Sequence, residues 1–149
     1  MSEVDFPGMG FVLQKALPNH SEIRFIPSQE DVTDYTVWEK YLTDEIDMVF
    51  ISHAYSNTGQ LSPIDKVLSL ARSKNILSIL DVAQSVGIVP IDLEALEPDF
   101  MIGSSVKWLC GGPGSAYLWV NSKRLPYCKP RDVGWFSHEN PFEFDIHDF

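Results

Sequence analysis

The sequence has few cysteines, few basic residues and no long hydrophobic run. Its 149 residues contain two cysteines, Cys110 and Cys128, too few for a disulfide framework or a zinc cluster. Lysine and arginine number 11 against 21 aspartates and glutamates, so the net charge is −10. That charge argues against a nucleic-acid backbone or an anionic membrane surface as the partner. No apolar stretch approaches the roughly 18 residues that a membrane span needs, so we expect no membrane association.

Aromatic and aliphatic residues are plentiful enough for a folded core. Hydrophobic residues make up 44% of the chain, including 4 Trp, 5 Tyr and 9 Phe. That content excludes a disordered chain, and the length fits one domain. Residues 1–11 carry acidic side chains but none of the basic ones that open a secretory signal. We therefore expect an acidic globular protein of the cytoplasm.

Three elements are predicted in the first third of the chain. Apolar residues recur at helical spacing over Asp5–Leu17, which predicts a helix ending at Pro18. Glu22–Ile26 mixes β-branched and aromatic residues and predicts a short strand. Asp31–Asp44 places its apolar residues near one side and predicts an amphipathic helix.

The middle of the chain predicts a strand–helix–strand unit. Asp47–Ile51 and Ile76–Leu80 are nearly continuous apolar runs, typical of buried parallel strands. Between them, Ser62–Asp65 offers an N-cap serine, a proline at the first helical position and an early acid, which predicts a helix start. Short connections make the two strands parallel. Together with two further predicted strands, Phe100–Gly103 and Ala116–Val120, this predicts an α/β protein with a mostly parallel sheet flanked by helices.

Polar residues follow three predicted strands, at the edge where open α/β sheets bind ligands. Ser52 and His53 follow the first, Asp81 the second and Ser104–Lys107 the third. A carboxylate there can pair with a protonated heteroaromatic nitrogen, and a lysine can form a Schiff base. Pyridoxal phosphate chemistry needs those two groups most, although a plain Asp–Lys salt bridge also fits the spacing. No histidine or cysteine shows metal-ligand spacing, so no metal is expected.

Two motifs carry a resemblance to a known family. Asp81–Gly87, followed by Asp99-Phe100 and Ser104–Leu109, resembles the class V aminotransferase superfamily of pyridoxal phosphate enzymes of fold type I, and is most similar to kynureninases. Matches in the same order extend the resemblance over nearly the whole chain: Asp5–Pro7, Ser52–Gln60 and Val133–Glu139. The resemblance implies a partial large, cofactor-binding domain over residues 1–125 and an irregular segment over residues 126–149 that leads towards a C-terminal part.

The resemblance implies a role for each polar residue at the sheet edge. Lys107 matches the lysine that joins the cofactor as a Schiff base and moves protons at the substrate carbon. Asp81 matches the carboxylate that keeps the pyridine nitrogen protonated, which makes the ring an electron sink. Gln84 lies where relatives place a group near the ring hydroxyl, and His53 is a candidate for stacking on the ring.

The cofactor phosphate has its own candidate residues. Ser104 and Ser105 lie where relatives place a phosphate ligand. Trp135 matches a tryptophan that, in kynureninases, reaches the phosphate from the neighbouring subunit, so we expect a homodimer. Each role has a plainer alternative. Asp81 could cap a turn, Lys107 could lie free on the surface, and the serines could satisfy backbone groups at a strand end.

Two positions depart from the kynureninase pattern, and a third departs from the desulfurase pattern. Kynureninases have His where this chain has Gln84 and Tyr where it has Val106, whereas Gln is common in cysteine desulfurases. Tyr55 lies where desulfurases have Asn near the ring hydroxyl. The expected reaction is hydrolysis of L-kynurenine to anthranilate and alanine. An aminotransferase or a desulfurase-like enzyme acting on another amino acid is the first alternative, and a non-catalytic remnant is the second.

Two expected parts of such an enzyme have no match in this sequence. One is the Gly/Ser/Thr-rich turn that opens a helix on the cofactor phosphate. The other is the arginine that binds the substrate carboxylate, whose planar fork of donors suits that task. We therefore expect the 149-residue chain to be a fragment of the large domain and, by itself, not a competent enzyme.

Overall fold

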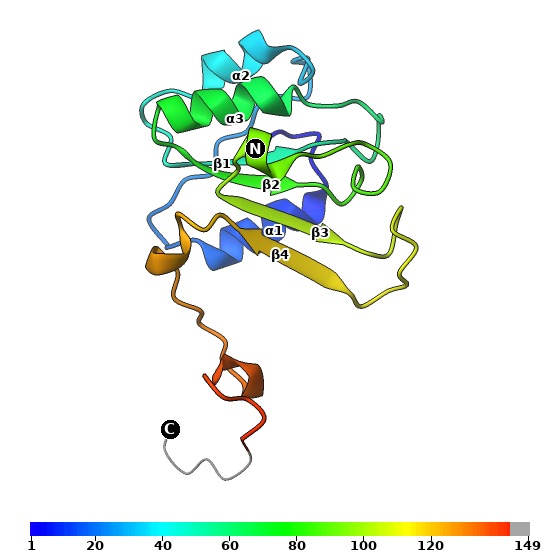
Figure 1. Cartoon of the computed structure of the whole chain (residues 1–149). Helices are drawn as coiled ribbons and strands as arrows, with labels where there is room; N and C mark the ends of the chain where they lie inside the picture. Colours follow the sequence, from blue (N-terminus) through cyan, green and yellow to red (C-terminus); the bar gives the residue numbers. More distant parts are fainter. Residues whose placement is uncertain (144–149) are drawn as a thin grey trace.

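A four-stranded sheet is the centre of the computed structural model, which describes residues 1–143 (Figure 1). The strands lie in the order β1-β2-β3-β4, in which the first three are parallel and β4 is antiparallel to β3. Their bounds are Met48–Ser52 for β1, Leu77–Asp81 for β2, Phe100–Ser104 for β3 and Ala116–Val120 for β4. The predicted α/β class and mostly parallel sheet are thus confirmed.

Four α-helices accompany the sheet within the described residues, and α2 and α3 lie together on one side of it while α1 lies on the other (Figure 1). The helices are α1 (Pro7–Ala16), α2 (Tyr35–Tyr41), α3 (Ile64–Ser73) and α4 (Leu93–Leu96), and two 3-10 turns follow, η1 (Leu125–Tyr127) and η2 (Trp135–Ser137). The predicted helices over residues 5–17 and after Ser62 are therefore present.

The core lies between the sheet and α3. Ile51, Leu80 and Met101 are neighbours in register, so their side chains share one face of the sheet. α3 presents a stripe of fully buried residues to the same core: Val67, Leu68 and Ala71. Burying each large aliphatic side chain contributes roughly 1.5–3 kcal/mol. This packing holds β1 and β2 at fixed positions, and with them the residues that follow their ends.

The opposite face of the sheet is less covered. Phe50 at its β1 side is 3% exposed, but Leu118 in β4 is 64% exposed. α1 lies on this side and buries none of its own residues, and Phe11 and Val12 in it are mostly exposed. The described residues therefore form a well-packed layer on one side of the sheet and a partial layer on the other.

The predicted strand over Glu22–Ile26 is wrong. Only Ile26 forms a β-bridge, to Ser2 in parallel, with the Ile26 N–H donating to the Met1 carbonyl and the Glu3 N–H donating to the Ile26 carbonyl. A strand needs a neighbour along its whole length, and within residues 1–143 only the first three residues pair with this segment.

Two helix starts also differ from the predictions. The predicted helix over residues 31–44 shrinks to α2, because Asp31 closes a turn by accepting from the Thr33 N–H at 2.9 Å and Asp34 becomes the N-cap. Ser62 is not the N-cap of α3. Its hydroxyl instead donates to the Ser52 carbonyl at 2.7 Å and lies 3.1 Å from the Tyr55 hydroxyl. The Ser62 hydroxyl therefore bonds the carbonyl at the end of β1 and does not cap α3.

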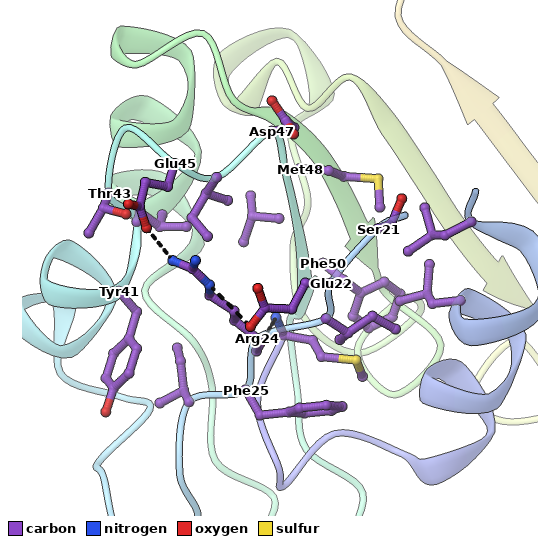
Figure 2. Close-up of a pocket in the computed structure, with 18 of the residues that line it drawn as sticks. Ser21, Glu22, Arg24, Phe25, Tyr41, Thr43, Glu45, Asp47, Met48 and Phe50 are labelled. Atoms are coloured by element: carbon purple, nitrogen blue, oxygen red, sulfur yellow. Dashed lines mark hydrogen bonds and ion pairs between the residues drawn. The ribbon is translucent and has the colours of Figure 1, made fainter. Parts of the chain in front are cut away.

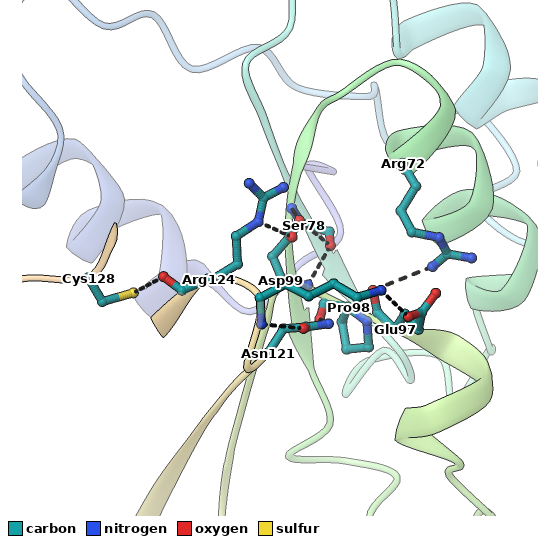
Figure 3. A network of polar contacts seen from close by, with 9 residues as sticks. Arg72, Ser78, Glu97, Pro98, Asp99, Asn121, Arg124 and Cys128 are labelled. Atoms are coloured by element: carbon teal, nitrogen blue, oxygen red, sulfur yellow. Dashed lines mark hydrogen bonds and ion pairs between the residues drawn. The ribbon is translucent and has the colours of Figure 1, made fainter. Parts of the chain in front are cut away.

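A buried polar network ties β2, β3 and the segment after β4 together at the end of the sheet opposite Asp81 (Figure 3). Asp99 accepts from the Ser78 N–H at 2.8 Å and the Ser78 hydroxyl at 3.1 Å. Its other oxygen accepts from Arg124 Nε at 2.6 Å, and Asn121 donates to the Pro98 carbonyl. Asp99 is 8% exposed, so these donors replace the water that its carboxylate lost.

Residues 126–143 run away from the sheet (Figure 1). Trp135, Phe136 and Phe142 contact one another there, and each is more than half exposed. The last part of the predicted irregular segment, residues 144–149, lies outside the described residues. No helix within residues 1–143 combines the length and the apolar character needed to cross a membrane.

Candidate active site

The carboxyl ends of β1, β2 and β3 bring the predicted polar residues to one edge of the sheet. Ser52 and Asp81 are direct partners in register, and Asp81 is paired with Ile102 in β3. The alignment continues past the strands, because the His53 N–H donates to the Asp81 carbonyl at 2.8 Å and the Val82 N–H to the Ile102 carbonyl at 3.0 Å. The backbone therefore fixes Asp81 in the middle of this edge.

The Asp81 carboxyl is half-buried and incompletely bonded by the protein. One oxygen, Oδ1, accepts from the Ala83 N–H at 2.8 Å. Burial raises the pKa of Asp81, while the Ala83 N–H and the positive charge of Lys107 act to lower it. No ion pair within 4.0 Å joins the two residues in the part of the chain described. The plain salt bridge is thus not formed, and both groups are available to a ligand.

Lys107 is exposed on a tight loop between β3 and β4. The loop closes on Ser105, whose N–H donates to the Ser115 carbonyl at 3.0 Å and whose carbonyl accepts from the Gly111 N–H at 2.8 Å. A Cβ at Gly111 would lie 2.7 Å from the Ser105 Cβ, so this approach requires glycine. The Ser105 hydroxyl lies 3.3 Å from two loop carbonyls, those of Gly112 and Ser115. These contacts hold the loop that carries the lysine in place.

The turn after Asp81 packs against this lysine loop at Gly87. Gly87 has φ of +93°, and a Cβ there would lie 3.2 Å from the backbone carbon and oxygen of Trp108. Both the backbone angle and the close contact disfavour any side chain. Gly87 therefore couples the segment that carries Asp81 to the loop that carries Lys107.

Replacing Gly87 with alanine should loosen the lysine loop. We expect a loss of about 1–3 kcal/mol in the free energy of unfolding, measured in urea, from the strained φ. We also expect faster hydrogen exchange at the Gly111 N–H, because Trp108 must move. Gly59→Ala is the matched control, since Gly59 has φ of +72° and no atom within 4 Å of its Cβ position. Equal exchange at Gly111 in the two variants would contradict this coupling.

Three buried side-chain atoms lack a hydrogen-bond partner in the described residues: Asp5 Oδ1, His53 Nδ1 and the Tyr117 hydroxyl. All three belong to this region. His53 directly follows β1. Burial raises the pKa of Asp5 and of Tyr117, and the negative charge of Asp81 raises both further. Ser52 lowers the pKa of Asp5. Orphaned polar atoms beside a carboxyl and a free lysine fit a site that holds a polar ligand. They also fit the ring of a pyridine cofactor, which carries a nitrogen and a hydroxyl.

The sequence predictions missed Asp5 and Tyr117. Asp5 precedes a helix and so has the pattern of a cap, but its Oδ2 accepts from the Ser2 N–H at 2.7 Å instead. Tyr117 lies in an ordinary strand, and its hydroxyl occupies the space that a side chain on Gly103 would fill, 2.2 Å from the Cβ position. The signal for this contact in the sequence is a glycine in one strand opposite a tyrosine in the next.

The other predicted site residues occupy different surroundings. Gln84 and Ser104 are half-buried near the edge, and their side chains make no hydrogen bond within residues 1–143. His53 is 5% exposed, and burial lowers its pKa. Trp135 lies in the projecting tail and donates to the Pro141 carbonyl, so a single chain does not bring it to Asp81.

The Tyr55 side chain is buried and its hydroxyl is already hydrogen-bonded within the protein. Its side chain is 2% exposed, and its hydroxyl lies 3.1 Å from the Ser62 hydroxyl. Burial raises the pKa of Tyr55 well above its usual range. The tyrosine therefore fastens the β1–α3 loop.

A cavity of about 520 Å³ lies elsewhere, along the free edge of β1 (Figure 2). Met48 and Phe50 line it, and Arg24 crosses it to Glu45 at 2.6 Å and Glu22 at 3.6 Å. These ion pairs are exposed, and neither Asp81 nor Lys107 lines the cavity. It is therefore a separate hollow and not part of the site at Asp81.

Curated relatives of this chain include enzymes of more than one activity. It is 28% identical over 144 residues to the uncharacterized aminotransferase YcbU of Bacillus subtilis, covering 95% of this chain and 38% of that protein. It is 33% identical over 122 residues to a kynureninase of Burkholderia mallei, covering 81% of this chain and 28% of the enzyme. The chain thus spans 28% and 38% of the lengths of these two relatives.

Solved structures of similar fold include enzymes with a pyridoxal phosphate cofactor. The cystine C-S lyase C-DES, in complex with cysteine persulfide, superposes with a TM-score of 0.78 at 27% identity, over 90% of this chain and 37% of that one. A variant of the same lyase holds glycine covalently linked to its pyridoxal phosphate cofactor. An alanine–glyoxylate aminotransferase from Nostoc shares the fold, with a TM-score of 0.73 at 23% identity over 91% of this chain and 37% of that one.

A family model decides the assignment, because it covers most of the chain. The model for class V aminotransferases matches residues 12–141, which include β1 to β4 and the segments that carry Asp81 and Lys107. The sheet order and the paired motifs after β2 and β3 agree with it. The chain belongs to the class V aminotransferase family.

Proposed function

We propose that this chain carries the cofactor-binding core of a pyridoxal-phosphate-dependent enzyme acting on an amino acid. One observation carries the proposal: a half-buried carboxyl at the end of β2 and an exposed lysine on the loop after β3 share one sheet edge without forming an ion pair. A carboxylate and a lysine amine are the two protein groups that this cofactor uses most.

The residues at this edge divide the tasks. Asp81 would hold a proton on the cofactor's ring nitrogen, and Lys107 would bind the aldehyde carbon through Nζ and later move a proton. When bound, pyridoxal phosphate supplies an electron sink for a substrate carbanion. Gln84, whose amide makes no hydrogen bond within residues 1–143, would contact the ring hydroxyl, and His53 would stack on the ring. Ser104 has a free hydroxyl for the phosphate, whereas Ser105 would have to exchange its loop carbonyls for it.

We infer kynureninase-like hydrolysis of L-kynurenine to anthranilate and alanine as the reaction of the whole enzyme. The 33% identity to a kynureninase supports it. Gln84 and Val106 favour a second candidate, an aminotransferase or a lyase acting on a sulfur amino acid, as does the 27% identity to a cystine lyase. Residues 1–125 would form the partial cofactor domain and residues 126–149 would lead away from it, in a cytoplasmic protein.

We propose that the complete enzyme is a homodimer, and the position of Trp135 supports this. The tail carries this residue away from its own sheet edge, and its aromatic cluster with Phe136 and Phe142 is exposed. We propose that Trp135 reaches the phosphate site of a second copy in the complete enzyme. The large share of the relatives that this chain does not span would supply the remaining phosphate and substrate contacts.

The purified chain tests the proposal directly. Pyridoxal phosphate is added, the visible absorption band is recorded, the adduct is reduced with borohydride, and the modified lysine is mapped by peptide mass spectrometry. We expect selective labelling of Lys107. Asp81→Ala should lose that selectivity, because the carboxyl no longer holds the ring nitrogen.

An exposed carboxyl supplies the matched control. Asp44→Ala removes a carboxyl that is 95% exposed and precedes β1, at the other end of that strand from Ser52, and should label like the wild type. Labels scattered over several lysines in the wild-type chain would overturn the proposal that these residues form a cofactor site by themselves.

A further inference from the structure

The free edge of β1 faces the hollow shown in Figure 2. β1 is the first strand in the sheet order, so β2 pairs with one of its edges and no strand within residues 1–143 pairs with the other. The Leu77 N–H in β2 donates to the Asp47 carbonyl, so alternate residues from Asp47 onwards bond to β2. The N–H and C=O groups of Met48 and Phe50 therefore point into the hollow, which both residues line.

A short parallel ladder lies beside the same hollow, where residues 1–3 pair with residues 24–26. The Met1 amino group donates to the Arg24 carbonyl at 3.3 Å, and the Met1 carbonyl accepts from the Ile26 N–H at 2.9 Å. The Glu3 N–H then donates to the Ile26 carbonyl at 2.9 Å, which completes the alternation of a parallel pair. The next donor in this alternation, the Arg24 N–H, has no acceptor among the described residues. The ladder therefore stops at Met1, while residues 22 and 23 extend beyond it.

The Met1 amino group occupies a place in this ladder that suits a peptide N–H. Burial lowers the pKa of this amine, because its charged form loses hydration. A peptide N–H in the same place would make the same hydrogen bond to Arg24 and would carry no charge to desolvate. The ladder therefore favours continuation of the backbone before Met1 over an end at this point.

Apolar side chains line the hollow from both sides of the sheet. α1 contributes Leu13 and Leu17 on one side, and Trp38 and Leu42 contribute from α2 and its C-cap on the other. A strand in the hollow would thus be covered on both faces. Strands of that kind are runs of aliphatic and β-branched residues, as β1 itself is.

The Arg24 side chain lies across the hollow (Figure 2). Its guanidinium is 2.6 Å from the Glu45 carboxylate and 3.6 Å from that of Glu22, and all three side chains are substantially exposed. Exposed ion pairs of this kind contribute little to stability. A strand that paired with β1 would therefore displace the guanidinium at small cost.

We propose that this hollow is an open strand position, and that it receives the residues that precede Met1 in a longer form of the protein. That segment would run parallel to β1, bond Met48 and Phe50 on one side, and continue the ladder with Arg24 on the other. The ladder leads into the hollow from Met1, which favours this occupant over a second copy of the chain. The chain spans 38% and 28% of the lengths of two relatives, so a longer form has ample residues for it.

A chain with a short extension tests the proposal. Six residues, Val-Thr-Val-Thr-Val-Val, are placed before the first residue of the 149-residue chain, and hydrogen exchange is measured for each amide by NMR. We expect the Met48, Phe50 and Arg24 N–H groups to exchange about tenfold more slowly or better than in the unextended chain, because each gains an acceptor. The Val49 and Ile51 N–H groups point towards β2 and should change much less.

A proline-containing extension is the matched control. The same length with proline at every second position stays apolar but cannot donate hydrogen bonds at those positions. It should leave Met48, Phe50 and Arg24 exchanging as fast as in the unextended chain. The midpoint of urea unfolding should rise with the Val/Thr extension and stay unchanged with the proline-containing one.

Three results would each overturn the proposal. Unchanged exchange at Met48 and Phe50 in the Val/Thr-extended chain, with Val49 and Ile51 still protected, would show that a folded chain does not accept a strand there. Equal slowing by both extensions would show that any apolar segment covers the hollow without pairing. Protection that appears in the unextended chain as its concentration rises, together with a dimer in analytical ultracentrifugation, would assign the edge to a second copy.

Discussion

Replacing Lys107 with alanine is expected to reduce covalent pyridoxal phosphate labelling of the chain to the background of its other lysines. The structure gives the reason: Lys107 is exposed, unpaired with Asp81, and held on a loop that closes on Ser105. Borohydride reduction followed by peptide mass spectrometry measures the loss. The visible band of the unreduced mixture should fall in parallel.

Arginine at position 107 separates the charge of the lysine from its chemistry. Lys107→Arg keeps a cation near Asp81, but a guanidinium is always protonated and does not form an imine. It should therefore lose the label as completely as alanine does. Lys123→Ala, which removes an exposed lysine paired with Glu97 at 2.7 Å, should keep it. Full labelling of Lys107→Ala would place the attachment elsewhere and contradict the site.

The regular elements of this fold are predictable from the sequence because their patterns are local. The apolar runs of β1 and β2 reflect burial within the sheet, and each of these two strands lies about one residue from its predicted bounds. The segment over Glu22–Ile26 has the composition of a strand, but a strand depends on a neighbour that its own sequence does not encode. The predicted cap at Ser62 is wrong for a similar reason, since the Ser52 carbonyl on the preceding strand accepts its hydroxyl.

The same distinction applies to the site. Asp81 and Lys107 follow strands, so topology alone predicts that they share an edge. Asp5 reaches that edge from a loop before α1, and Tyr117 reaches it across the β3–β4 pair. Those contacts depend on tertiary packing and not on spacing. The predicted role of Trp135 needs a second chain, so the structure of a single chain does not show that contact.

Replacing Asp99 with alanine should destabilise the fold strongly, because the substitution breaks a buried hydrogen-bond network. Asp99 is 8% exposed and accepts three hydrogen bonds, two from Ser78 and one from Arg124. Its removal leaves the buried Ser78 N–H and hydroxyl without their acceptor. We expect a loss of about 3 kcal/mol in the free energy of unfolding in urea, after allowing for the partial exposure of Arg124.

Two variants separate the buried hydrogen bonds from the ion pair. Arg124→Ala removes the charge partner but leaves both Ser78 bonds, and the Arg124 side chain is 36% exposed, so a loss nearer to about 1 kcal/mol is expected. Asp44→Ala, at a carboxylate 95% exposed and 3.3 Å from Lys74, should change stability little. If Arg124→Ala cost as much as Asp99→Ala, the ion pair between Asp99 and Arg124, and not the Ser78 bonds, would account for the stability that this network contributes.

The Asp99 variant should also affect cofactor labelling. Ser78 and Asp81 lie on the same strand, β2, so loosening the Ser78 end of the strand should shift the Asp81 carboxyl and weaken Lys107 labelling.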